Sequence, residues 1–136
     1  MMAQGQNINV QSILEKIIKK STPPQGLHGC TIWRGATCNR GLYGQMRNPC
    51  MIYTNTATVT VHRLVYLLHK LEDYPDYNLP HFDVGGEALH VSHICHNSLC
   101  TNIHHLCFER QSINNERHSC KTQNLCTKLH VPACLL

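Results

Sequence analysis

The sequence predicts a small α+β domain with short antiparallel sheets, whose apolar core is too thin to stabilise the fold by itself. The chain has 136 residues, the size of one ordinary domain. Apolar residues make up 42% of it, but aromatic residues only 6%. Nine cysteines and eleven histidines are the unusual feature of the composition. Disulfides or bound metal therefore supply part of the stability.

Several features favour metal over disulfides. The odd number of cysteines would leave one thiol unpaired in a disulfide framework, and such a framework has no use for the surrounding histidines. Residues 1–5 do not resemble a secretory signal, and no apolar run is long enough to cross a bilayer. We expect a reduced intracellular protein, in the nucleus, with zinc on its thiolates and no membrane contact. A secreted disulfide scaffold is disfavoured.

The net charge of +4 is compatible with nucleic-acid binding but, taken alone, indicates only a solvated, slightly basic surface.

The first predicted element is a short amphipathic helix over residues 10–20. Its apolar residues recur at helical spacing and are Ile13, Leu14, Ile17 and Ile18. Its last turn is basic, which suits the helix dipole. A loop containing Pro23, Pro24 and Gly26 ends it. We therefore separate residues 1–27, an N-terminal helix and linker, from a zinc-bound domain over residues 28–136.

The middle of the chain predicts short strands and a second helix. Residues 30–53 are interrupted by three glycines and a proline, which is typical of a small antiparallel sheet. Residues 56–60 alternate as another strand, and residues 62–71 place four leucines on one helical face. Residues 72–87 contain Pro75, Pro80 and a Gly-Gly pair, so they form a connection.

The last third predicts one strand and one helix around a dense group of cysteines and histidines. Residues 89–93 alternate as a strand that ends at His93. The polar segment 111–117 is interpreted as a short helix, with Ser112 as a possible N-cap. The tail from Cys120 has little apolar periodicity.

The first candidate zinc site is incomplete in the local sequence. Cys95, Cys100 and His105 follow the spacing Cys-x4-Cys-x4-His, so a fourth ligand must come from elsewhere. Cys30 is the leading candidate and Cys38 competes with it. His104 likewise competes with its neighbour His105.

The second candidate site is complete within fifteen residues of the tail. Its members are Cys120, Cys126, His130 and Cys134, spaced Cys-x5-Cys-x3-His-x3-Cys. Four such residues with almost no apolar core between them predict a structural zinc site. The three other cysteines, Cys38, Cys50 and Cys107, are better interpreted as small buried apolar residues than as ligands.

One segment carries a specific resemblance. Residues 91–107 read Val-Ser-His-Ile-Cys-His-Asn-Ser-Leu-Cys-Thr-Asn-Ile-His-His-Leu-Cys, and Asn-Asn-Glu-Arg follows at 114–117. With the tail cysteines, this pattern resembles the His-Cys box homing endonucleases, a branch of the His-Me finger (ββα-metal) nucleases. Residues 30–33 and the glycine-rich stretch to Gly44 share the likeness more loosely. The resemblance implies a ββα-metal motif within the α+β domain.

The resemblance also implies roles for particular residues. The general base falls on His93, and the asparagine that binds the catalytic metal falls on Asn114. The family uses an arginine near the scissile phosphate, for which Arg63 is the candidate, with Arg34, Arg40 and Arg47 as alternatives. The implied zinc ligands are Cys30, Cys95, Cys100 and His105 in the first site, and Cys120, Cys126, His130 and Cys134 in the second.

The activity implied is Mg2+-dependent hydrolysis of phosphodiester bonds in duplex DNA by a symmetric homodimer with exchanged tails. The chemistry fits the residue types, since a neutral imidazole can accept the proton of a water, and one Mg2+ held by an asparagine can stabilise the phosphate. The two zinc ions would be structural. The alternative is a non-catalytic zinc-stabilised module that binds DNA or protein with the same fold.

Overall fold

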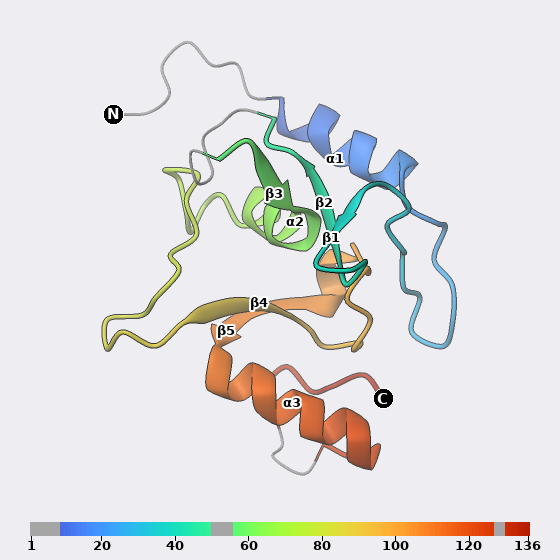
Figure 1. Cartoon of the computed structure of the whole chain (residues 1–136), viewed down its shortest axis with the longest axis vertical. Helices are drawn as coiled ribbons and strands as arrows, with labels where there is room; N and C mark the ends of the chain where they lie inside the picture. The colour runs from blue at the N-terminus through green and yellow to red at the C-terminus, as the bar shows by residue number, and fades with distance from the viewer. Residues whose placement is uncertain (1–8, 50–55, 127–129) are drawn as a thin grey trace.

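The structure is a computed structural model that describes residues 9–49, 56–126 and 130–136. Within these ranges the chain forms two antiparallel sheets and three α-helices, as an α+β fold (Figure 1). The elements in order are α1 (Val10–Lys19), β1 (Thr37–Cys38), β2 (Tyr43–Arg47), β3 (Thr58–Thr60), α2 (Val61–His69), β4 (Leu89–His93), the 3-10 turn η1 (Ile103–His105), β5 (Leu106–Arg110) and α3 (Gln111–Gln123). None of the described helices is long and apolar enough to span a membrane.

The N-terminal helix α1 contributes to the core. The Asn9 side chain accepts a hydrogen bond from the Ser12 amide at 2.9 Å, which caps the first turn. Ile13 and Ile17 are buried against the rest of the core cluster, in which α1 packs on α2. The predicted helix over 10–20 is therefore confirmed, and its apolar face serves the core.

The middle strand of the three-stranded sheet β1–β2–β3 packs against a buried tryptophan. Trp33 is 3% exposed, and its indole Nε1 donates to the carbonyl of Ala36 at 2.8 Å. The indole lies so close to Gly44 of β2 that a Cβ there would be 2.7 Å from Trp33 Cδ1. Only glycine fits at that position, which explains one of the glycines in this stretch. Predicted strand residues 50–53, together with Cys50, lie outside the described ranges, as do residues 1–8.

A β-hairpin followed by a helix forms the other half of the molecule. Strands β4 and β5 pair antiparallel from Leu89↔Arg110 to His93↔Leu106, and α3 follows β5 directly. Helix α2 packs against this hairpin, and so does α3, which Figure 1 shows on the side away from α2. The predicted strand over 89–93 is confirmed. Strand β5 was not predicted; its pairing with β4 supplies the hydrogen bonds that stabilise it.

Helix α3 begins where predicted, but it is longer and has a different N-cap. It runs from Gln111 to Gln123, and its N-cap position is Arg110, so the prediction of Ser112 as N-cap is wrong. The Ser112 amide instead donates to the Glu87 carboxylate at 3.0 Å. A side chain 25 residues earlier in the chain thus caps the helix, which is why local sequence did not reveal the capping group.

Candidate active site and metal centres

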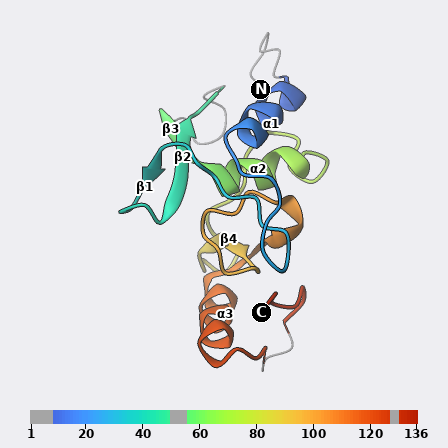
Figure 2. The ribbon, with the colours of Figure 1, turned by 90° about the vertical axis from the view of Figure 1, so that its right-hand side faces the viewer.

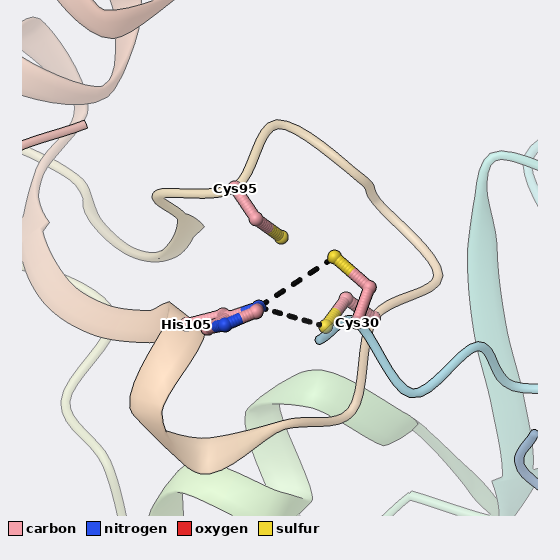
Figure 3. Close-up of side chains that lie close together, drawn as sticks. Cys30, Cys95 and His105 are labelled. Atoms are coloured by element: carbon pink, nitrogen blue, oxygen red, sulfur yellow. Dashed lines mark hydrogen bonds between the residues drawn. The ribbon is translucent and has the colours of Figure 1, made fainter. Parts of the chain in front are cut away.

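The first Cys/His group joins two distant parts of the chain. Cys30, Cys95, Cys100 and His105 place one ligand atom each within 4.8 Å of one another. His105 Nδ1 lies 3.6 Å from the sulfur of Cys30 and 3.4 Å from that of Cys100. Figure 3 shows the Cys95 sulfur directed into the same space. Of the two alternatives, Cys30 belongs to the group and Cys38 lies in β1.

Backbone pairing brings Cys30 to the loop between β4 and β5. The Trp33 amide donates to Leu99 O at 2.8 Å, and the Thr101 amide donates to Thr31 O at 2.7 Å. These bonds surround an antiparallel bridge between Ile32 and Cys100. Figure 2 shows the two loops side by side.

The distances within the first group, and those of the second group given below, suit zinc. With bond lengths of about 2.3 Å to sulfur and about 2.0 Å to nitrogen, tetrahedral coordination places each sulfur roughly 3.5 Å from the nitrogen. Three thiolates and one imidazole also match the preference of zinc, and such a closed set leaves no position for substrate. Both groups therefore can hold structural zinc ions.

The second group is built on the end of α3 and the C-terminal tail. Its members are Cys120, Cys126, His130 and Cys134. His130 Nδ1 lies 3.6, 3.3 and 3.8 Å from the sulfurs of Cys120, Cys126 and Cys134. Asn124 ends the helix in the left-handed conformation, with φ 55°, and turns the chain back toward Cys120.

Two side chains of α3 support the second group from outside. The Glu116 carboxylate lies 3.0 Å from His130 Nε2, so it fixes the ring orientation with Nδ1 directed at the sulfurs. Arg117 Nη1 donates to the Cys134 sulfur at 3.3 Å, while its Nε donates to Glu109 at 2.6 Å. Arg117 is 1% exposed. It therefore balances negative charge on both a thiolate and a buried carboxylate, and it connects the zinc group to β5.

We expect Arg117→Met to destabilise the domain by about 3 kcal/mol, because the substitution leaves the buried Glu109 carboxylate without its cationic partner. Urea unfolding of the zinc-loaded protein measures this loss. The double variant Arg117→Met/Glu109→Met should recover most of it, since the buried charge is then removed as well. A single variant within about 0.5 kcal/mol of wild type would contradict the assignment.

The protein contains a cleft of about 820 Å³. It is lined by residues of β2, α2, β4 and α3, and both His93 and Asn114 are among them. Five histidines line it in all: His62, His90, His93, His96 and His118. The structure thus brings the predicted base and the predicted metal-binding asparagine to the same cleft.

His93 ends strand β4 and is held from two sides. Its ring donates a hydrogen bond to the backbone of Cys100 in the first zinc loop. The other ring nitrogen, Nε2, is buried and has no hydrogen-bond partner among the described residues. The ring centroid lies 4.6 Å from that of His62, which in turn stacks on Tyr43 at 5.3 Å. Burial and the neighbouring His62 lower the pKa of His93 well below its ordinary value, so the ring is neutral at pH 7.

Asn114 lies on the first turns of α3 and contacts the strand that carries His93. Its Nδ2 lies 3.3 Å from Nδ1 of His90 in β4. The amide carbonyl oxygen is a hard neutral ligand of the type that Mg2+ accepts together with water and phosphate oxygens.

Arg63 lies on α2 and lines the cleft, but its guanidinium group binds main-chain carbonyls. Its Nη2 donates to Leu79 O at 3.1 Å and to Pro80 O at 2.9 Å. The group also lies 5.7 Å from the Phe108 ring. The alternatives Arg34, Arg40 and Arg47 are exposed.

Three residues with no predicted role lie beside the predicted pair: Tyr43, His62 and His90. His62 precedes Arg63, and its ring packs against that of His93 in a tilted arrangement. Burial, followed by the charge of His90, lowers the pKa of His62 to about 4. The histidine-rich composition was the only signal that could have pointed to His62 and His90. Among the other cysteines, Cys107 is buried outside both groups, and burial raises the pKa of its thiol to about 12.

Comparison with known proteins agrees with the Cys/His groups. A family model described as the zinc-binding loop region of homing endonuclease matches residues 38–134. This range contains His93, Asn114 and every member of the two groups except Cys30. No curated protein matches the chain.

Proposed function

The chain belongs to the family of the zinc-binding loop region of homing endonuclease, and from that membership we propose that it is a Mg2+-dependent endonuclease that hydrolyses phosphodiester bonds of duplex DNA. The observation that carries the proposal is the shared lining of one cleft by His93 and Asn114. The two residues come from β4 and α3 of a β-hairpin and helix, which is the ββα arrangement of the His-Me finger nucleases.

His93 acts as the general base. Its Nε2 accepts a proton from a water whose oxygen forms the new bond to phosphorus, while the bond from phosphorus to the 3′ oxygen breaks. A buried ring nitrogen without a hydrogen-bond partner lowers the stability of the fold, so its presence needs an explanation such as a catalytic role. Nε2 of His93 is such a nitrogen among the described residues. The hydrogen bond to the Cys100 backbone and the His62 ring restrain the imidazole. The first zinc group thereby positions the base without touching the substrate.

Asn114 holds the catalytic cation through its carbonyl oxygen. When bound there, Mg2+ supplies positive charge at the phosphate and at the leaving 3′ oxygen. The cleft around Asn114 contains cationic and neutral side chains such as Lys121 and Thr122, which favour a phosphate rather than repel it.

The duplex lies along the sheet β1–β2–β3. Strand β2 begins in the cleft at Tyr43 and ends at the exposed Arg47. Arg47 pairs in register with Thr58 of β3, and Gln45 Nε2 donates to the Thr58 hydroxyl at 3.0 Å. One face of the sheet therefore presents polar side chains beside the cleft, with Met46 and Val59 toward the core.

Two copies of the chain act on opposite strands of the duplex, as the family resemblance implies. The stoichiometry of the DNA complex, measured by sedimentation, tests this part of the proposal. In the single chain the C-terminal tail contacts the residue before Cys95 of the first zinc group. The Leu135 amide donates to Ile94 O at 2.8 Å.

We expect Arg47→Gln to weaken the dependence of DNA binding on salt, because the variant neutralises one phosphate fewer per chain. The slope of log K against log salt should become shallower by about 0.9 for each phosphate that is no longer neutralised. Arg47→Lys keeps the charge and should retain the wild-type slope. Fluorescence anisotropy with a labelled duplex at several salt concentrations measures both. Equal slopes for Arg47→Gln and wild type would place the phosphate-binding side chains elsewhere.

The proposal is tested by nicking of supercoiled plasmid by the zinc-loaded protein in Mg2+. Nicking that requires Mg2+ supports it. A protein that binds duplex DNA but nicks no faster than buffer is instead a non-catalytic zinc-stabilised module.

A further inference from the structure

The amide of Asn114 is in contact with a histidine to which the nuclease chemistry assigns no role. Asn114 Nδ2 lies 3.3 Å from Nδ1 of His90, and both side chains line the cleft. An amide nitrogen can only donate, so the ring nitrogen is the acceptor and His90 carries its proton on Nε2. The amide oxygen and nitrogen lie on opposite sides of one carbon. The oxygen of Asn114 is therefore directed away from His90.

A second contact joins α3 to the neighbouring strand β5 of the same hairpin, one helical turn further on. In the β4–β5 ladder His90 lies opposite Glu109. The Glu109 carboxylate accepts from Arg117 Nε at 2.6 Å and from Arg117 Nη2 at 2.9 Å. Asn114 and Arg117 are three residues apart, so they lie on the same face of α3. The buried ion pair thus fixes α3 against the hairpin at the point where Asn114 meets His90.

We propose that His90 is a positioning residue for the cation site. It holds the Asn114 amide so that the carbonyl oxygen is free for the metal. This inference rests on the proposed function. Without the acceptor on His90 the amide can rotate and present its NH2 group, which repels a cation. Partners that orient a metal ligand typically contribute a factor of 10–100 in metal affinity.

His90 acts through Asn114 and is not itself a ligand. Among the described residues, two groups of three or more His, Cys, Asp or Glu side chains are close enough to hold one ion. These are the two zinc groups, and His90 belongs to neither. Its Nδ1 lone pair is engaged with Asn114. The effect of His90 should therefore be on the affinity for the cation and not on the chemical step.

The test is the Mg2+ dependence of plasmid nicking. We expect His90→Ala to raise the half-saturating Mg2+ concentration about tenfold, with a rate at saturating Mg2+ close to that of wild type. His90→Asn places an amide oxygen where Nδ1 lay and should restore the wild-type Mg2+ dependence. His81→Ala removes an exposed histidine outside the cleft and serves as the matched control. Zinc content and the urea midpoint should be unchanged in all three.

A readout without catalysis separates this inference from the proposed function. Binding of Mn2+ by the zinc-loaded protein, with and without duplex DNA, can be followed by electron paramagnetic resonance. Weaker Mn2+ binding by His90→Ala supports the inference even if wild type does not nick DNA. Unchanged Mn2+ affinity and Mg2+ dependence in His90→Ala would overturn it, as would a lower rate at saturating Mg2+ with no shift in Mg2+ dependence.

Discussion

Removing zinc with a chelator should unfold the domain and release α3 and the tail. The buried apolar cluster is formed by residues up to Leu106, and its described members include none from α3 or the tail. The buried residues of α3 are Arg117, which donates to Cys134 of the second zinc group, and Cys120, which belongs to that group. The apparent free energy of zinc binding, about 10–16 kcal/mol in zinc-finger peptides, is comparable with the whole stability of a domain, about 5–15 kcal/mol.

Far-UV circular dichroism during titration with EDTA measures the unfolding, and metal analysis before titration should give two zinc ions per chain. Added Zn2+ should restore the signal, whereas added Mg2+ should not, because Mg2+ prefers oxygen ligands to thiolates. A chain that loses both zinc ions and keeps its helical signal would show that the apolar cluster is sufficient for folding.

Two neighbouring histidines provide a matched pair of variants for the first site. His105 is 4% exposed and faces the sulfurs, whereas its neighbour His104 is exposed. His105→Ala should reduce the zinc content to about one ion per chain, since each structural site needs four ligands. His104→Ala should keep two. A loss of zinc in His104→Ala alone would reverse the assignment of the ligand.

The two zinc groups differ in how far local sequence could predict them. The tail group has all four members within one short segment, so spacing alone identified it. The first group needs Cys30, which is 75 residues from His105, and spacing could not choose it over Cys38. The choice depends on the bridge between Ile32 and Cys100, a tertiary pairing that the sequence does not display.

The elements that could not be predicted from the sequence are those stabilised by distant partners. The five residues of β5 follow η1 directly, and only the pairing with β4 distinguishes them from a loop. Helix α3 has little apolar periodicity, so the sequence predicted only its first part, residues 111–117. Glu87 caps its start, and Cys120 holds its end in the second zinc group. Similarly, nothing local indicated that the guanidinium group of Arg63 binds the carbonyls of Leu79 and Pro80.

Substitution of His93 should have the largest effect on activity. We expect His93→Ala to lower the rate of plasmid nicking in Mg2+ by about 10²–10⁴-fold, the contribution of a general base. His93→Asn is the sharper variant, because its amide can still donate to the Cys100 backbone but offers no base at the ε position. Both variants should lose activity alike, while zinc content and affinity for duplex DNA stay at wild-type levels.

The same assay applied to Asn114 separates the base from the cation site. Asn114→Ala should be as inactive as His93→Ala at ordinary Mg2+ concentrations, whereas Asn114→Asp keeps an oxygen ligand and should retain Mg2+-dependent nicking. The loss in His93→Asn should persist at every Mg2+ concentration, since no added cation replaces the proton acceptor. A general base contributes more than about tenfold to the rate. If His93→Asn nicks DNA within about tenfold of the wild-type rate, another group accepts the proton. The unpartnered nitrogen of His93 is then a cost of packing the ring against His62.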